Sequence, residues 1–568
     1  MTRSRRRQPE DHVEHDTTCV PNVPPSGRTS VILTGLALVL LVGGVYVATI
    51  RPDVRAGDSA EIQLMAALLG VCHPPGYGLL VSVGHLFTLL PFGPDAAWRV
   101  NLMLAVCGVL GALTLFGVLR RLTGRVLPAF LAALTLAFSI AYWMHSVVTE
   151  VYVFHALFLL LALYAAVRFF DSDRARWLYL AALCLGICIG GRLSEVTVIP
   201  AFVVLWLGAR RRVRVTWKRT AISAALACLP FAYNAGYFLC RQVPGTPPVR
   251  DDALRDEILN LEPPVATLPA GQRLKEAIAY SAGLRGRGRE NFTEVSWWRL
   301  GWDLNKYAWQ LSGIAAWGDR FPEESRLVDP ILAFRQREQG SGTSITILGT
   351  ALALFGFRHW RRRKHVLLCG ALLFLGNLSY YLYMHPVDNL QFILPGLIGL
   401  TLLIACGLTP HEATASDTSG KTRRGPWKTG MLYAFGAVPP LFLLLTNWSI
   451  FNYQTPAFQQ SLESTAKIKA TPLPPDTVII ATYPPAQRFR YLYWAAMGRT
   501  DIHVILFREE YDIPELRKLV QTLHQRGVYT LLCSEVIGKE DTMRMLAQIT
   551  PAEFVAIGLY QFYPQGKR

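Results

Sequence analysis

Residues 56–78 read AGDSAEIQLMAALLGVCHPPGYG and set two carboxylates, Asp58 and Glu61, one helical turn apart. They stand at the mouth of the first long apolar segment of the chain. Ionisable side chains at membrane depth are costly and usually face a cavity, so both acids are candidates for a functional site. The spacing also fits a simple helix start, with Asp58 as the capping residue and Glu61 in the first turn.

The composition indicates a polytopic membrane protein. Of the 568 residues, 51% are hydrophobic and only 17% are charged, which leaves room for many spans. The net charge of +17 resides in short basic loops between apolar runs, a pattern typical of cytoplasmic loops, so we expect no nucleic-acid partner. The ten cysteines contain no CxxC pair, which argues against a disulfide framework or a zinc site.

The apolar pattern predicts the membrane topology. Residues 1–29 are polar and arginine-rich and predict a disordered cytoplasmic tail. Residues 31–50 are long enough to cross a bilayer, whereas 79–91 are shorter and predict an interfacial or re-entrant helix. Further spans are expected at residues 100–119, 126–144, 151–169, 177–190, 194–209, 220–240, 343–357, 365–383, 389–407 and 429–447.

This arrangement of about eleven spans puts the strongly basic short loops on one face, as the positive-inside rule requires. The N-terminus is then cytoplasmic and the C-terminus extracytoplasmic. The unusual polar residues at outer span ends gather on the second face, which suits an outward-facing polar cavity. These residues are Glu150, Glu195 and Asp388, together with His73, His145, Arg192 and His385.

Several of these residues also have a purely structural interpretation. Glu195 could pair with Arg192, three positions earlier on a helix. Asp388 could cap a helix N-terminus. His85 and His155 are expected to be half-buried, hydrogen-bonded histidines rather than catalytic ones.

Outside the spans, the sequence predicts two outer loops and one further domain. A transmembrane domain at 30–449 would carry the outer loops 51–98 and 242–342. The second loop contains a tryptophan-rich stretch, 297–309, which is expected at the bilayer interface but could also stack on sugar or hold a lipid tail. Residues 450–568 alternate strand-like and helix-like segments and predict a small extracytoplasmic α/β domain with a mainly parallel sheet. This domain has no GxGxxG fingerprint or P-loop.

The order of the motifs resembles the protein O-mannosyltransferase-like membrane proteins of the GT-C glycosyltransferase superfamily. The resemblance is strongest to a bacterial family that has a protein O-mannosyltransferase as its animal relative. That family carries a DSGE-like motif, HPPGYPLY, AEVY and a late D-x-x-x-F-x-LP. Here they read DSAE (58–61), HPPGYG (73–78), TEVY (149–152) and DNLQFILP (388–395). The resemblance covers about residues 30–410; Ala60 and Gly78 depart from the family pattern and leave both carboxylates in place.

The resemblance implies a GT-C-like helical membrane fold and an inverting transferase in the bacterial plasma membrane. Its donor would be a polyprenyl-phosphate sugar, with a mannose-like hexose expected, and its acceptor a protein Ser or Thr or an envelope glycan or lipid. Asp58 would act as general base, Glu61 would orient the acceptor or share the proton, and Glu150 would support the site from across the cavity.

The donor phosphate would need a nearby cation as its bond to the sugar breaks. Arg192, Arg99 and His73 are the candidates, in that order, although His73 is better suited to positioning its loop. The remaining substrate-binding candidates are Pro74, Pro75, Tyr77, His145 and Asp388. No metal ligand is assigned, and a divalent metal requirement stays open.

Two other classes of function fit parts of the pattern. A transporter would use intramembrane acids to couple ion movement, but these acids lie at one mouth and no paired broken helices recur in two halves. A non-catalytic envelope-assembly protein could bind polyprenyl phosphate or a glycan without chemistry. Loss of activity on carboxylate substitution separates the enzyme from this binding protein, and flux assays test the transporter.

Overall fold

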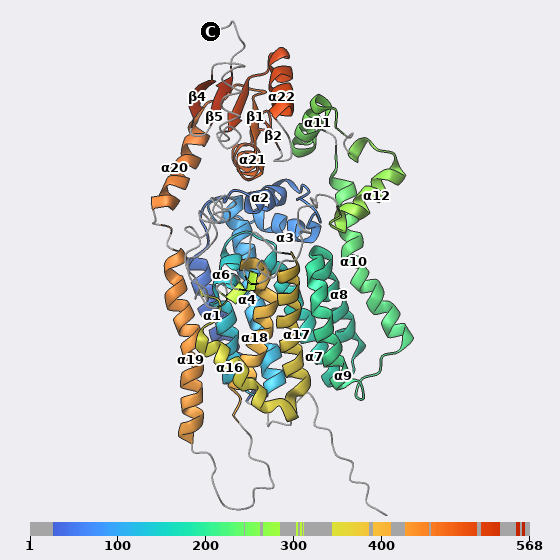
Figure 1. The fold of residues 1–568 in the computed structure, drawn as a ribbon, viewed down its shortest axis with the longest axis vertical. Coiled ribbons are helices and arrows are strands. Elements are labelled where there is room, and N and C mark those ends of the chain that lie inside the picture. Colours follow the sequence, from blue (N-terminus) through green and yellow to red (C-terminus); the bar gives the residue numbers. More distant parts are fainter. Residues whose placement is uncertain are drawn as a thin grey trace, which may run out of the picture.

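A computed structural model of the chain describes residues 27–243, 245–261, 265–284, 343–384, 390–410, 426–451, 456–507, 513–533, 552–556 and 559–562, and single residues between these ranges. Figure 1 shows a long helical bundle that carries a small α/β domain at one end. The predicted tail up to residue 26, the tryptophan-rich stretch in large part, and Asp388 lie outside the described residues.

The first half of the chain supplies most of the bundle helices. Its elements are α1 (Arg28–Ala48), α2 (Asp58–Leu68), α3 (Gly78–Thr88), α4 (Ala96–Thr123), α5 (Val126–Ala137), α6 (Ile140–Val147), α7 (Tyr152–Ser172), α8 (Ala175–Gly191), the 3-10 helix η1 (Leu193–Val198), α9 (Ile199–Ala209) and α10 (Trp217–Arg241). The later bundle elements are α16 (Ile347–Gly356), α17 (Trp360–Met384), the 3-10 helix η5 (Leu390–Ile393), α18 (Leu394–Gly407) and α19 (Pro426–Trp448). Between α10 and α16, α11 (Pro247–Leu259) lies beside the α/β domain, and α12 (Ala270–Ser281) packs against α10 (Figure 1).

Six described helices are long and apolar enough to cross a membrane, or up to seven if the bent pair α5 and α6 counts as one span. The chain is therefore a multi-pass helical membrane protein. The helices α3, α8, η1 with α9, and α18 are apolar but shorter, so the total of about eleven spans stays a prediction. The expected single span 126–144 is wrong in its geometry, because α5 and α6 meet at an angle of 64°.

The bend between α5 and α6 has a local and a tertiary cause. The Ser139 side chain accepts a hydrogen bond from the Tyr142 amide and so begins a new helix. The Ile140 amide donates to the carbonyl of Thr343, far along the chain. Both contacts divert backbone donors that a straight helix would use internally.

The basic loops meet at the end of the bundle opposite the α/β domain. Arg363 donates to the Leu122 carbonyl at 2.5 Å and to the Thr123 carbonyl at 3.1 Å. Arg358 donates to the Gly407 carbonyl at 3.0 Å. The arginines thus close helix C-termini, where the unpaired carbonyls and the helix dipole favour cations.

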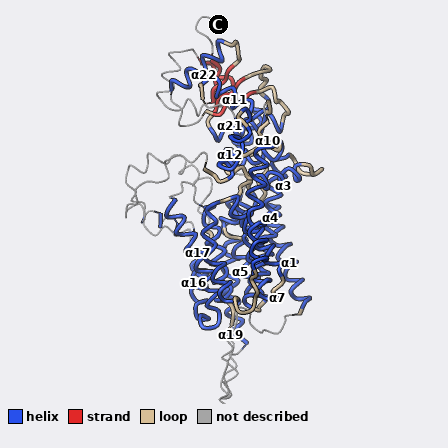
Figure 2. Tube along the Cα trace, turned by 90° about the vertical axis from the view of Figure 1, so that its right-hand side faces the viewer, coloured by secondary structure: helices blue, strands red, loops and turns tan. Residues whose placement is uncertain are grey.

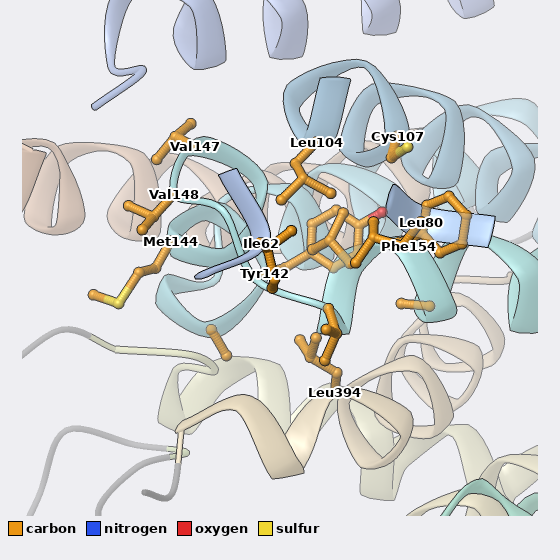
Figure 3. Packing of buried hydrophobic residues seen from close by; sticks show 14 of the residues in the cluster. Ile62, Leu80, Leu104, Cys107, Tyr142, Met144, Val147, Val148, Phe154 and Leu394 are labelled. Atoms are coloured by element: carbon orange, nitrogen blue, oxygen red, sulfur yellow. The ribbon is translucent and has the colours of Figure 1, made fainter. Parts of the chain in front are cut away.

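Close backbone contact holds the bundle together at glycines. A Cβ on Gly186 of α8 would lie 2.2 Å from the Ala227 carbonyl oxygen of α10. A Cβ on Gly399 of α18 would lie 2.4 Å from the Gly370 carbonyl oxygen of α17. Small residues permit this approach, which is a common packing mode in membranes. Figure 3 shows part of the apolar core, which contains the fully buried residues Ile62 of α2, Leu104 of α4 and Tyr142 of α6.

The C-terminal domain is the predicted α/β unit. Its sheet contains β1 (Val478–Ala481), β2 (His503–Leu506), β3 (Thr530–Cys533), β4 (Ala552–Ala556) and β5 (Leu559–Phe562) in the order β2-β1-β3-β5-β4. The pairs β1–β2 and β1–β3 are parallel, whereas β3–β5 and β4–β5 are antiparallel. Helix α21 (Tyr483–Arg490) with the π-helical turn η7 (Tyr491–Ala496), and α22 (Ile513–Gln525), connect the parallel strands. An amphipathic helix, α20 (Pro456–Ala470), leads into the domain.

The domain is docked on the bundle through α21, which lies between the sheet and α2 (Figures 1 and 2). The Gly57 amide donates to the Pro484 carbonyl at 3.3 Å. The Ala97 amide donates to the Tyr491 hydroxyl at 2.8 Å. On a second side, buried Asp251 of α11 accepts from the Val504 amide of β2 at 2.7 Å. These contacts fix the position of α21 above α2.

Candidate active site

Both predicted acids lie in the first turn of α2. The residue before that turn, Gly57, has φ +86° and ψ −145°, a conformation that only glycine adopts without strain. It turns the chain sharply, so that Asp58 and Glu61 point toward the docked α21. Asp58 is half-buried and Glu61 is 5% exposed.

Glu61 is held by the HPPGYG loop. Its Oε1 accepts from the backbone amide of His73 at 2.9 Å, and its Oε2 lies 2.5 Å from His73 Nδ1. Burial alone would lower the pKa of His73, but the charge of Glu61 and the hydrogen bond to it raise this pKa to about 9. At neutral pH, His73 is therefore an imidazolium paired with Glu61.

A tyrosine of the C-terminal domain bridges the two carboxylates. The Tyr483 hydroxyl lies 2.9 Å from Asp58 Oδ1 and 2.9 Å from Glu61 Oε2. It has one hydrogen, which the two carboxylates share. No motif in the sequence of this domain indicates a site residue. The available signal was the position of Tyr483 directly after a buried parallel strand, since ligand sites favour the carboxyl ends of such strands.

Asp58, Glu61 and His73 also form a possible metal site. Each offers one ligand atom, and these atoms lie within 4.8 Å of one another. A divalent ion there would compete with the proton between His73 and Glu61, because a metal ligand must be deprotonated. The chemistry of the three donors fits a hard or borderline cation.

Glu150 lies near the same group. The Ser59 hydroxyl is 3.4 Å from Glu150 Oε1, and the charge of Glu150 contributes to the raised pKa of His73. The structure thus gathers three predicted catalytic residues, Asp58, Glu61 and Glu150, around His73.

Arg192 directly follows the C-terminal residue of α8 and pairs with Glu195. Its Nη1 lies 3.0 Å from Glu195 Oε1, with both side chains buried. Its guanidinium carbon lies 4.4 Å from the ring centre of Tyr152 and 5.3 Å from that of Phe392. The structural interpretation of Glu195 as a partner of Arg192 is therefore confirmed, and the planar cation is held against aromatic rings.

These groups open on one large cavity of about 2520 Å³. Glu61, His73, Arg192 and Tyr483 all line it. Asp58 lies beside this wall and is hydrogen-bonded to Tyr483, which is part of it. Other predicted site residues on the wall are Pro74, Pro75 and Tyr77.

The cavity changes character along its length. Toward the bundle, apolar residues of α8 and α10 line it, namely Leu185, Gly186, Ile189, Ala227 and Phe231. Toward the C-terminal domain its wall is polar, with Asp252, Arg255, Lys275, Glu276, Gln487 and Arg490. One end therefore suits an acyl or prenyl chain and the other a polar molecule.

Two predicted substrate-binding residues among the described ones, Arg99 and His145, are not found on this wall. Arg99 uses its guanidinium to donate to the Phe92 carbonyl at 2.8 Å and the Thr88 carbonyl at 2.7 Å, so it holds the loop after α3. His145 is 4% exposed, and neither ring nitrogen has a hydrogen-bond partner within the described residues. Asp388 falls outside them.

The two histidines expected to be structural have main-chain hydrogen bonds. His85 Nδ1 lies 2.8 Å from the Ala66 carbonyl, and His155 Nδ1 lies 2.7 Å from the Val151 carbonyl. His155 is 3% exposed, deeper than the half-buried state expected from sequence. It sits where a Cβ on Gly191 would lie 1.8 Å from its Nε2.

The fold is that of an ArnT-like membrane protein. The crystal structure of ArnT from Cupriavidus metallidurans in the apo state superposes with a TM-score of 0.55 over 94% of this chain and 98% of that one. Sequence identity is 12%, so this similarity concerns the fold alone.

Comparison of the sequence with known families matches one segment of the chain, which contains Asp58, Glu61 and Glu150. Residues 58–215 match the family described as the protein O-mannosyl-transferase TMEM260 N-terminal domain. Protein O-mannosyl-transferase TMEM260 of Mus musculus is 35% identical over 150 residues, which cover 26% of this chain. The Dictyostelium discoideum protein of the same description is 26% identical over 178 residues, which cover 29% of this chain.

The matched segments span 21% and 22% of these two relatives. The family resemblance inferred from the motifs is thereby confirmed for the segment that holds Asp58, His73, Glu150 and Arg192. This chain is a homologue of protein O-mannosyltransferases in that segment.

Proposed function

We propose that the protein is a membrane glycosyltransferase of the GT-C type that uses a polyprenyl-phosphate sugar. The observation that carries this proposal is the joint position of Glu61, His73 and Arg192 on the wall of one cavity. A carboxylate centre and a cation are the two groups that transfer from a lipid-phosphate donor needs. The match of residues 58–215 to protein O-mannosyltransferases supports the same chemistry.

The donor would lie with its prenyl chain along the apolar cavity wall that α8 and α10 supply. Its phosphate would meet Arg192, which has a planar guanidinium that can donate two parallel hydrogen bonds to phosphate oxygens. Its sugar would extend toward Glu61 and His73. A mannose-like hexose is the sugar we propose, on the strength of the family match alone.

In the reaction, Asp58 would accept the proton of the acceptor hydroxyl as this oxygen bonds to sugar C1. The bond between C1 and the phosphate oxygen would break, and the released polyprenyl phosphate would keep the electron pair and remain beside Arg192. One displacement of this kind inverts the configuration at C1 and forms no covalent enzyme intermediate. Glu61, which accepts two hydrogen bonds from His73, would fix the loop and the acceptor.

The acceptor would enter through the polar part of the cavity below the C-terminal domain. We propose a protein Ser or Thr hydroxyl as acceptor, with an envelope glycan or lipid as the alternative. This assignment is supported by the description of the relatives as protein O-mannosyl-transferases.

We also propose the eleven-span topology in a bacterial plasma membrane, with the α/β domain extracytoplasmic. The gathering of the basic loops at the opposite end of the bundle supports this orientation. Cysteine labelling tests it: positions 58 and 150 should react from outside and position 361 from inside. Labelling of any of these from the other side would contradict the topology.

The decisive experiment measures transfer of label from polyprenyl-phosphate mannose, and then from other sugars, in membranes with wild-type protein, Asp58→Asn or Glu61→Gln. We expect transfer by the wild type and none by Asp58→Asn, which keeps shape and loses only the base. Transfer by Asp58→Asn at the wild-type rate, with loss in Glu61→Gln, would move the base to Glu61. If folded wild-type protein transfers no sugar, the protein binds lipid-linked glycan without chemistry.

A further inference from the structure

We propose that Tyr483 is a positioning residue for the catalytic carboxylates, so that the C-terminal α/β domain completes the active site. The inference rests on the proposed transferase function. It assigns a role to a domain that lies outside the segment shared with protein O-mannosyltransferases.

The geometry around Asp58 makes this role specific. Glu61 accepts two hydrogen bonds from His73 in addition to that from Tyr483. For Asp58, the side-chain hydrogen bond recorded within the described residues comes from Tyr483. Loss of the Tyr483 hydroxyl would therefore leave Glu61 anchored and release Asp58.

Tyr483 is suited to remain a donor in this place. Its hydroxyl lies 2.9 Å from Asp58 Oδ1 and 2.9 Å from Glu61 Oε2. A carboxylate oxygen can only accept a hydrogen bond, so the phenol is the donor in both contacts. A neutral donor between two carboxylates reduces their mutual repulsion without cancelling the charge that a base needs.

The position of the tyrosine is set by the sheet and by a second hydrogen bond. Tyr483 begins α21 just after the carboxyl end of β1, the strand that pairs with β2 and β3 in parallel. The next residue, Pro484, accepts from the Gly57 amide, directly before Asp58. Farther along, Arg490 lies 3.1 Å from Asp252 of α11. Helix α21, which begins with Tyr483, is thus attached to the bundle near its first residue and to α11 near its last residue.

The substitution Tyr483→Phe removes only the hydroxyl. Because a misplaced reacting group by about 1 Å can cost on the order of 100-fold in rate, we expect kcat to fall about 10- to 100-fold. The KM for the donor should stay within about twofold of the wild-type value. The substitution does not alter Arg192 or the apolar cavity wall of α8 and α10. A defect confined to domain docking would instead lower the amount of folded protein and leave the kcat of the folded fraction unchanged.

Tyr493→Phe is the matched control. It removes a buried hydroxyl of the same domain that has no hydrogen-bond partner within the described residues. We expect its kcat to equal that of the wild type. Equal kcat values for Tyr483→Phe and the wild type would overturn the inference while leaving the transferase function intact.

A second arm does not depend on activity. The pair Asp58→Cys and Tyr483→Cys is treated with a short bifunctional thiol reagent in membranes, and the linked peptide is identified by mass spectrometry. A pair of Asp58→Cys with Lys518→Cys, at an exposed position of α22, serves as control. We expect a link in the first pair only. Its absence would overturn the inference even if the wild type transfers no sugar.

Discussion

His73 gives Glu61 two hydrogen bonds, one from its backbone amide at 2.9 Å and one from Nδ1 at 2.5 Å. The first depends on the fold of the HPPGYG loop, and the second is charged while the imidazole is protonated. The pair thus couples the loop to the first turn of α2. Because the second bond depends on protonation, it also makes the coupling sensitive to pH.

The first prediction concerns stability between about pH 6.5 and pH 9. The pKa of His73 rises from 6.5 to about 9 on folding. A raised pKa in the folded state stabilises the protein fully below 6.5, and this contribution is lost as the pH rises through about 9. We expect the thermal midpoint in detergent to fall over this interval.

The substitution His73→Asn should remove most of this fall, and Glu61→Gln should do the same because it removes the charge that raises the pKa. A wild-type midpoint that stays constant from pH 6.5 to 9 would contradict the charged pair. So would an unchanged slope in both variants.

The second prediction concerns the phosphate-binding role of Arg192. Substituting Arg192 alone would leave Glu195 buried without its partner, which destabilises proteins by about 3–5 kcal/mol. The double variant Arg192→Gln with Glu195→Gln avoids this and should remain folded. We expect its KM for the polyprenyl-phosphate donor to rise at least about tenfold, equivalent to about 1.4 kcal/mol of binding.

Glu195→Gln alone is the control, because the Gln side-chain oxygen can still accept a hydrogen bond from Arg192 and the cation stays beside Tyr152. Its donor KM should change little. A double variant with the donor KM of the wild type would exclude Arg192 from phosphate binding.

The third prediction concerns Gln487, which lies one helical turn after Tyr483 and lines the same cavity. It is 2% exposed, and its Oε1 has no hydrogen-bond partner within the described part of the chain. Leaving a buried acceptor without a hydrogen bond costs about 1–3 kcal/mol. A hydrogen-bond donor of the substrate would remove this cost by bonding to Gln487 Oε1. Gln487→Met should therefore raise the acceptor KM while the thermal midpoint stays equal or increases.

Leu506→Met, on the same wall, tests whether any change of that surface has this effect, and its acceptor KM should be unchanged. If Gln487→Met lowers the midpoint and leaves the acceptor KM at the wild-type value, the residue serves packing.

Local patterns were sufficient to predict much of the fold. Apolar length predicted α1 and the short α3, and alternating strand and helix signals predicted β1, β2 and β3 with their connecting helices. The break between α5 and α6 was missed, because the hydrogen bond from Ile140 to Thr343 joins residues about 200 positions apart.

The candidate site was predictable only where its residues lie close together along the sequence. Asp58, Glu61 and His73 lie within one short stretch, so their proximity follows from local structure. Tyr483 is 425 positions from Asp58, and its role depends on how a separate domain docks. Arg99 was expected near phosphate, but two main-chain carbonyls within hydrogen-bonding range hold its guanidinium.

The last prediction concerns the packing of α8 against α10. These two helices supply the apolar cavity wall proposed for the prenyl chain of the donor. A Cβ on Gly186 would lie 2.2 Å from the backbone oxygen of Ala227, which cannot rotate away. Gly186→Ala should therefore push the helices apart and lower stability by about 1–3 kcal/mol, as overpacking does. The matched variant Gly236→Ala changes an α10 glycine with nothing within 4 Å of its added Cβ, and it should lose no stability. Thermal unfolding of both variants measures this difference in stability, and the donor KM is measured for the same two proteins. Equal stability of Gly186→Ala and the wild type would mean that α8 and α10 are not in backbone contact at Gly186.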